Sequence, residues 1–195
     1  MADFWQMIWE NQSKIIIQLT DLSENGVVRC AEYLPPSEVL DCHRLYGDYQ
    51  VTLKSRELRD NYITSYIQLK RMEDNLVRDI THLWYSSWPV TGVPNQVRTI
   101  VTMLLEARKG QLKEQPGPIV VHCSPGTGRT GTALAIDICL RQLDSTRSID
   151  IPRCVYRLRQ DRFGCVQTKE QYAFIYKVTM LLSTCTLDSV NCLVV

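Results

Sequence analysis

The chain lacks three features that would mark common functional classes. Its 22 basic and 21 acidic side chains leave a formal net charge of +1, so no general attraction to nucleic acid or to an anionic membrane is expected. No uncharged apolar run approaches the length that spans a bilayer. Residues 1–10 carry acids and large aromatics where a secretory leader has a basic start and an apolar stretch. We therefore expect no nucleic-acid partner and no membrane span in this chain.

Metal-ligand patterns are also missing. The chain has 3 histidines and 8 cysteines, and no second cysteine or histidine pair stands at the separation of a zinc site. The cysteines are too sparse for a small disulfide-stapled scaffold. We expect no metal, no cofactor and free thiols, which suits a cytoplasmic, reducing location.

The most informative segment that is present is the glycine-rich loop of residues 122–131, HCSPGTGRTG. The apolar run of residues 118–122 precedes it and the amphipathic residues 132–141 follow, which predicts a loop between a buried strand and a helix N-terminus. Glycine permits the backbone turns that let successive N–H groups converge on one anion, assisted by the helix dipole. Those amides and nearby Arg129 favour a thiolate at Cys123, and Arg129 can clamp a tetrahedral anion. The loop therefore predicts an oxyanion-binding site.

The same loop resembles the signature of the protein tyrosine phosphatases, His-Cys-(five residues)-Arg-Ser/Thr-Gly. The resemblance implies that Cys123 attacks phosphorus to form a cysteinyl-phosphate, that Arg129 binds phosphate oxygens, and that Thr130 assists breakdown of the intermediate. It also implies that His122 tunes the thiolate by hydrogen bonding. The remaining residues of the loop would bind the phosphate: Ser124, Pro125, Gly126, Thr127 and Gly128. The alternative is that Cys123 is a small buried hydrophobe beside a turn, which three glycines and an arginine beside it argue against.

One position departs from the family. The mobile loop that normally reads Trp-Pro-Asp supplies the general acid, but this chain reads Trp88-Pro89-Val90. Val90 cannot transfer a proton, and positioned acid–base catalysis is typically worth about 10²–10⁴ in rate. We expect a weak phosphotyrosine hydrolase. Trp88 is expected to pack in the core, with a role as a hinge of the mobile loop as the alternative. The alternative is a catalytically inactive pseudophosphatase that binds phosphotyrosine partners or regulates a sister phosphatase domain.

The resemblance extends to residues on both sides of the two loops. By its spacing from Cys30, Glu24 would hold Arg129 in its phosphate-binding rotamer, whereas without the alignment Glu24 reads as a solvated turn residue. Gln167 resembles the glutamine that positions the hydrolytic water. Gln171 either joins it at the substrate or closes a capping box with Thr168.

Two arginines near this glutamine also have two readings. By resemblance, Arg159 and Arg162 line the rear of the pocket. Otherwise they form an exposed basic face of a helix, which is the commoner fate of arginine.

The expected fold class is α/β, a twisted mixed sheet flanked by helices as in the phosphotyrosine phosphatase fold but lacking its N-terminal part. The family's domain normally begins earlier, with a tyrosine-bearing loop that grips the substrate ring. We therefore expect residues 1–183 to form one domain that is incomplete at its N-terminus, followed by a tail of residues 184–195. The partners implied are phosphotyrosine-containing proteins and a sister phosphatase domain, in the cytoplasm or in the cytoplasmic part of a receptor.

Periodicity and turn signals predict the elements around the loop. Strands are expected at residues 14–20, 48–53, 62–69, 76–84 and 118–122, and helices at residues 3–12, 96–109, 152–162 and 168–182 as well as after the loop.

Overall fold

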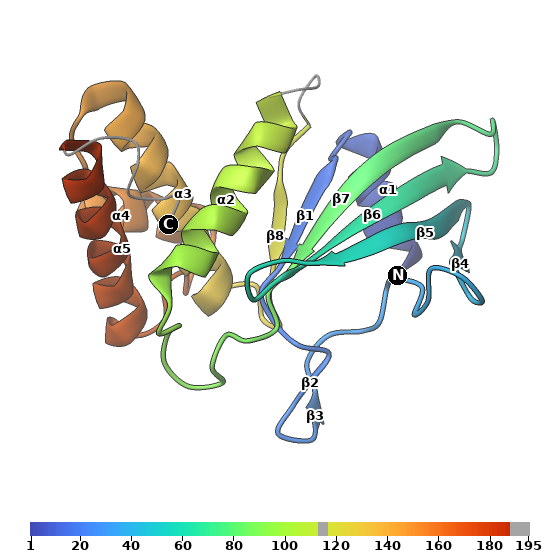
Figure 1. Cartoon of the computed structure of the whole chain (residues 1–195), viewed down its shortest axis with the longest axis horizontal. Coiled ribbons are helices and arrows are strands. Elements are labelled where there is room, and N and C mark those ends of the chain that lie inside the picture. Colours follow the sequence, from blue (N-terminus) through green and yellow to red (C-terminus); the bar gives the residue numbers. More distant parts are fainter. Residues whose placement is uncertain (113–116, 188–195) are drawn as a thin grey trace. The chain divides into compact units, whose positions relative to one another are not determined.

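The computed structural model describes residues 1–112 and 117–187 (Figure 1). The chain divides into two compact units, one formed by residues 1–88 and 102–124 and the other by residues 89–101 and 125–195. Each unit is described by itself. The expected mixed α/β class is confirmed, with a six-stranded mixed sheet in the first unit and mostly helices in the second.

The sheet of the first unit has the strand order β4-β5-β6-β7-β1-β8. Its strands are β4 (His43–Tyr46), β5 (Tyr49–Leu58), β6 (Ile63–Arg71), β7 (Val77–Trp84), β1 (Ile15–Gln18) and β8 (Val120–His122). β4 to β7 form an antiparallel meander, whereas β1 runs parallel to both β7 and β8. The parallel strands end in register, because Gln18 is paired with Trp84 on one side and with His122 on the other. Open α/β sheets place their ligands at this carboxyl end of parallel strands.

Helix α1 (Ala2–Glu10) supplies the apolar layer that covers one face of the sheet. Trp5, Ile8 and Trp9 are buried and share one helical face by their i, i+3 and i+4 spacing. They form one core with residues of β5, β6 and β7. The guanidinium of Arg78 lies 3.9 Å from the centre of the Trp9 ring, a cation–π contact that joins α1 to β7.

Helix α2 (Val97–Leu112) belongs to both units, since the unit boundary falls after Val101. In the first unit the Glu106 carboxylate accepts a hydrogen bond from the Tyr62 hydroxyl and lies 3.4 Å from the Thr64 hydroxyl. Burial and the bond to Glu106 both raise the pKa of Tyr62. The helix is thereby attached to strand β6.

The second unit packs α3 (Gly128–Thr146) against both α4 (Ile151–Asp161) and α5 (Lys169–Leu187). α4 is capped by Asp150, whose side chain accepts from the Arg153 amide at 2.9 Å, and Pro152 lies in the first turn as predicted. α5 begins after Thr168, whose hydroxyl accepts from the Gln171 amide at 3.2 Å. The cap of α5 was predicted from the sequence, whereas the Asp150 cap of α4 was not.

Several predicted boundaries need correction. The helix after the signature loop begins at Gly128 instead of residue 132, so Arg129 and Thr130 are helical. The strand expected at residues 48–53 continues to Leu58 past a register shift between Leu53 and Ser55. The short strands β2 (Ser23–Glu24), β3 (Val27–Val28) and β4 were not predicted. Of the expected tail, residues 184–187 continue α5, and residues 188–195 lie outside the described residues.

Among the helices of the described residues, none combines the length and the apolar character that crossing a lipid bilayer requires.

Candidate functional site

Cys123 follows directly after strand β8, at the carboxyl end of the parallel strands of the first unit. Its side chain is buried, with the residue 7% exposed. The strand end is held by a hydrogen bond of 2.9 Å from the Leu19 amide to the His122 carbonyl. The predicted nucleophile is thus the first residue after a strand end that is held by backbone pairing.

His122 lies in a buried hydrogen-bond network centred on Tyr33. The Tyr33 hydroxyl is 2.7 Å from His122 Nε2, 2.8 Å from His82 Nε2 and 3.0 Å from Gln18 Oε1. The His122 ring also bonds to the Cys123 backbone, while burial lowers the pKa of His122. The imidazole of His122 is therefore neutral, and it is hydrogen-bonded both to Tyr33 and to the Cys123 backbone.

Glu24 lies in the same unit, at the end of β2. One oxygen accepts from the Thr20 hydroxyl at 3.0 Å, and the other lies 3.9 Å from Arg29 Nε. Its side chain is only 8% exposed, which excludes the alternative of a solvated turn residue. Trp88, which ends the first segment of this unit, is also buried and contacts the Tyr85 ring edge-to-face.

In the second unit, Arg129 lies in the first turn of α3 and contacts the segment that carries Val90. Its Nη2 donates to the Pro89 carbonyl at 3.3 Å. Val90 follows Pro89 directly and is 44% exposed, with a side chain that has no proton to give. Thr130, next to Arg129, is buried at 5% exposure. The arginine and the position of the absent acid are thus neighbours within one unit.

The turn that carries Gln167 fits closely against the start of α3. A Cβ at Gly128 would lie 2.6 Å from Gln167 Oε1, and a Cβ at Gly131 would lie 2.7 Å from the Val166 amide nitrogen. At Gly131 a side chain would displace backbone, so the position requires glycine, whereas at Gly128 the ends of two glutamine side chains would have to move. The signature loop and the glutamine turn are therefore matched in shape.

Val166 has a φ of 58°, a left-handed conformation that is unusual for a β-branched residue. Arg159 holds this turn by donating to the Cys165 carbonyl at 3.0 Å and to the Val166 carbonyl at 2.8 Å. Strained backbone of this kind persists where its surroundings fix it, often at functional sites. Arg159 is consequently a support for the turn and not merely part of a solvated helix face.

Gln171 takes the capping role left open from the sequence. Its Oε1 accepts from the Gln167 amide at 2.8 Å and from the Thr168 amide at 3.4 Å. Its Nε2 faces Gly128, where a Cβ would approach to 2.9 Å. One side chain therefore both caps α5 and lies against the signature loop.

Arg162 attaches the loop from the other side, since its Nη2 donates to the Pro125 carbonyl at 3.0 Å. Gly126 has a φ of +67° that favours glycine. Ser124 and Pro125 are exposed, and the Thr127 hydroxyl is buried with no partner among the described residues. The phosphate-binding residues predicted from the sequence thus form one continuous turn.

Sequence reasoning missed the roles of Tyr33, His82 and Gln18. Tyr33 lies in a short segment after Cys30 that carries no periodic signal, and its partners Gln18 and His82 come from strands β1 and β7. Among the described residues, no group of three or more His, Cys, Asp or Glu side chains is arranged to hold a metal ion.

The mixed sheet of the first unit ends its parallel strand β8 at His122, and the glycine-rich segment that the sequence predicts as an anion-binding loop follows directly. A family model described as protein-tyrosine phosphatase matches residues 1–181. The chain belongs to the protein-tyrosine phosphatase family.

Curated relatives support the same assignment. The chain is 39% identical over 190 residues to a tyrosine-protein phosphatase Lar-like of Caenorhabditis elegans, covering 97% of this chain and 8% of that protein. It is 36% identical over 178 residues to human receptor-type tyrosine-protein phosphatase alpha, covering 91% of this chain and 22% of that protein. It is 34% identical over 183 residues to human tyrosine-protein phosphatase non-receptor type 5, covering 93% of this chain and 31% of that protein. The chain therefore spans less than a third of each of these relatives.

Proposed function

We propose that this domain binds phosphotyrosine in proteins through residues 122–130 and hydrolyses it slowly through Cys123. The observation that carries the proposal is the contact between Arg129 and Pro89. The phosphate-binding arginine is held by the segment in which Val90 replaces the acid. Binding needs the loop amides and the guanidinium, whereas rapid turnover also needs a proton donor.

The chemistry assigns one task to each group. The Cys123 thiolate attacks phosphorus, a sulfur–phosphorus bond forms, and the bond from phosphorus to the tyrosine oxygen breaks. The departing oxygen belongs to a phenol of pKa about 10, so it leaves slowly without a proton from the protein. Water positioned by Gln167 then hydrolyses the cysteinyl-phosphate, assisted by the Thr130 hydroxyl.

The other residues bind or support. The phosphate is bound by Arg129 and by the turn of Ser124, Pro125, Gly126, Thr127 and Gly128, with Gln171 beside it. Glu24 serves as a supporting carboxylate, His122 orders the thiolate, and Trp88 precedes the loop of Val90. Three contacts support this assignment. Arg162 donates to the Pro125 carbonyl of the signature loop, while Arg159 and Gln171 hold the turn that carries Gln167.

Kinetics with two substrates test the proposal. With a phosphotyrosine peptide, Val90→Asp should raise kcat by about 10²–10⁴, because a general acid is restored. With an aryl phosphate whose leaving group is a weak base, the same variant should change kcat little. The matched control is Val90→Asn, which has the shape of aspartate but no acidic proton.

Cys123→Ser in the Val90→Asp background should abolish turnover of both substrates. Equal rates for Val90→Asp and Val90→Asn on the peptide, or activity that survives loss of Cys123, would overturn the mechanism.

The replacement of the general acid by Val90 also favours a second function. A cradle that holds phosphate without turning it over is a phosphotyrosine-binding module, which captures phosphorylated partners or regulates a sister phosphatase domain. Binding of a phosphotyrosine peptide with no measurable wild-type turnover of either substrate would assign this function. A reducing compartment such as the cytoplasm suits both functions, because each keeps Cys123 as a thiol.

A further inference from the structure

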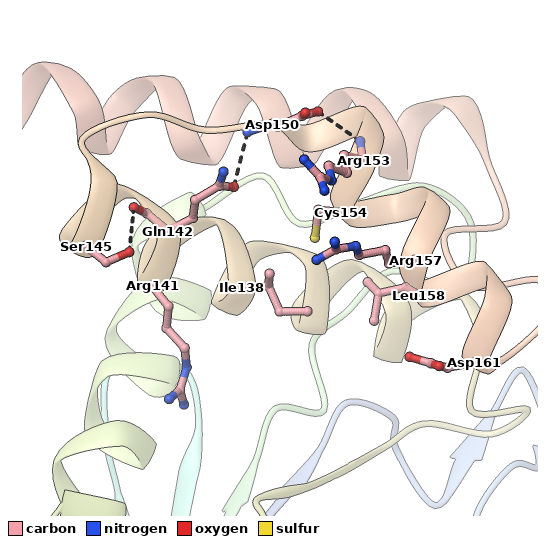
Figure 2. A pocket seen from close by; sticks show the side chains of 10 residues that line it. All are labelled: Ile138, Arg141, Gln142, Ser145, Asp150, Arg153, Cys154, Arg157, Leu158 and Asp161. Carbon is pink, nitrogen blue, oxygen red and sulfur yellow. Dashed lines mark hydrogen bonds between the residues drawn. The ribbon is translucent and has the colours of Figure 1, made fainter.

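The second unit contains a groove of about 620 Å³ lined by helices α3 and α4 (Figure 2). Ile138 and Gln142 of α3 line one side, and Arg153, Cys154 and Arg157 of α4 line the other. The Cys154 sulfur is drawn between the two helices, among these side chains (Figure 2). A small solvent-borne reagent can therefore reach a thiol that is otherwise buried.

Cys154 contacts the turn of α3 that ends at Cys139. Its Sγ lies 3.8 Å from the Ala135 carbonyl oxygen, one helical turn before Cys139. The two thiols are close enough for each to shift the pKa of the other through a side-chain hydrogen bond. Cys139 is completely buried, whereas Cys154 is 6% exposed and lines the groove. The pair thus consists of an accessible thiol and an inner one.

The contact makes the two thiols chemically different. The hydrogen bond from Cys139 lowers the pKa of Cys154 and raises the pKa of Cys139, with burial adding to the rise. The thiolate is the form that reacts with peroxides. Cys154 is therefore the thiol that ionises first and also the thiol that faces the groove.

We propose that Cys139 and Cys154 are a redox modification site that closes to a disulfide on reaction with hydrogen peroxide. The Cys154 thiolate attacks one peroxide oxygen and the oxygen–oxygen bond breaks, which gives a sulfenic acid and hydroxide. The Cys139 sulfur then attacks the sulfenic sulfur, a sulfur–sulfur bond forms, and water leaves. In total the two thiols lose two hydrogens, and one peroxide is reduced to two waters.

The bond would link the middle of α3 to the first turns of α4. α3 also carries Arg129 at its start, and Arg162 beyond α4 holds Pro125 of the signature loop. The disulfide would restrict this pair of helices and stabilise the second unit. The inference depends on the thiol contact and on the groove, so it is independent of the proposed phosphatase activity.

Peptide mapping tests the site with the intact chain. Trypsin cleaves after Arg129, Arg141, Arg153 and Arg157, so residues 130–141 contain only Cys139 and residues 154–157 contain only Cys154. After hydrogen peroxide and alkylation of free thiols, these two peptides should appear as one cross-linked species, two hydrogens lighter than their sum. Dithiothreitol should restore both peptides. The measurement is made in wild type and in Cys123→Ser, which removes a competing reactive thiol.

Variants separate the two roles. Cys139→Ser should leave a sulfenic acid on Cys154 that dimedone labels, whereas Cys154→Ser should leave Cys139 unoxidised. Cys165→Ser, which changes another buried thiol of the same unit, should form the cross-link as wild type does. Recovery of both peptides as alkylated thiols at peroxide concentrations that oxidise Cys123 would overturn the proposal. A cross-link from Cys154 to a different cysteine would also overturn it.

Discussion

The Tyr33 hydroxyl connects His82, His122 and Gln18, and each of these side chains lies at the carboxyl end of a strand or close to it. His82 is fully buried, and its Nδ1 has no hydrogen-bond partner among the described residues. Burial, with His122 and Arg56 nearby, lowers the pKa of His82 from 6.5 to about 3. The network therefore requires a neutral imidazole.

Stability should depend on pH because of this residue. Between pH 6.5 and about 3 the unfolded chain binds a proton at His82 and the folded chain does not. The contribution of His82 to the free energy of unfolding is therefore complete above pH 6.5. It falls as the pH is lowered, by up to about 1.4 kcal/mol per pH unit. Urea unfolding at about pH 7 and about pH 5 measures the fall.

His82→Gln should reduce that pH dependence, and His43→Gln, a change at an exposed histidine, should keep it. In wild type, the NMR shifts of the His82 ring should show no protonation down to about pH 5. A His82 ring that titrates near its ordinary pKa in the folded chain would contradict this account.

At the scale of elements, the start of α3 packs closely against the turn that carries Gln167. Gly128 and Gly131 allow the approach, and Arg159 donates to two carbonyls of the turn. One of these carbonyls belongs to the left-handed Val166, which directly precedes Gln167. The position of Gln167 therefore depends on a residue of α4.

Arg159→Ala should lower the free energy of unfolding by about 1 kcal/mol, since two hydrogen bonds from an exposed guanidinium are lost. It should also lower phosphotyrosine-peptide turnover in the Val90→Asp background, because Gln167 loses its fixed turn. The matched control is Arg157→Ala on the same helix, which should change the free energy of unfolding by less than about 0.5 kcal/mol. Equal effects of the two substitutions would show that the clamp contributes nothing.

Helices and strands were predictable from the sequence where a local pattern of residues determines them. Residues 14–20 and 118–122 are apolar runs, and Thr168 with Gln171 is a local capping pattern, so these predictions needed no long-range information. The two-residue strands β2 and β3 carry no periodic signal. The Arg159 clamp depends on packing between segments, and so does the contact of Cys139 with Cys154. No spacing in the sequence reports either one.

At the scale of the whole molecule, the family is established while the activity is a proposal. The chain covers 8%, 22% and 31% of three relatives, so what those complete proteins do does not transfer to it directly. The loop of residues 122–131 satisfies the family signature, whereas Val90 departs from it. The proposed phosphate binding and the proposed phosphate turnover are therefore tested separately.

The central claim is that residues 122–130 form a phosphotyrosine cradle, and calorimetric titration tests it most directly. A phosphotyrosine peptide and its unphosphorylated form are titrated into wild type, into Arg129→Ala and into Arg157→Ala. We expect the phosphorylated peptide alone to bind wild type and Arg157→Ala, and its binding to be lost in Arg129→Ala. Equal binding of both peptides, or undiminished binding after loss of Arg129, would contradict the account.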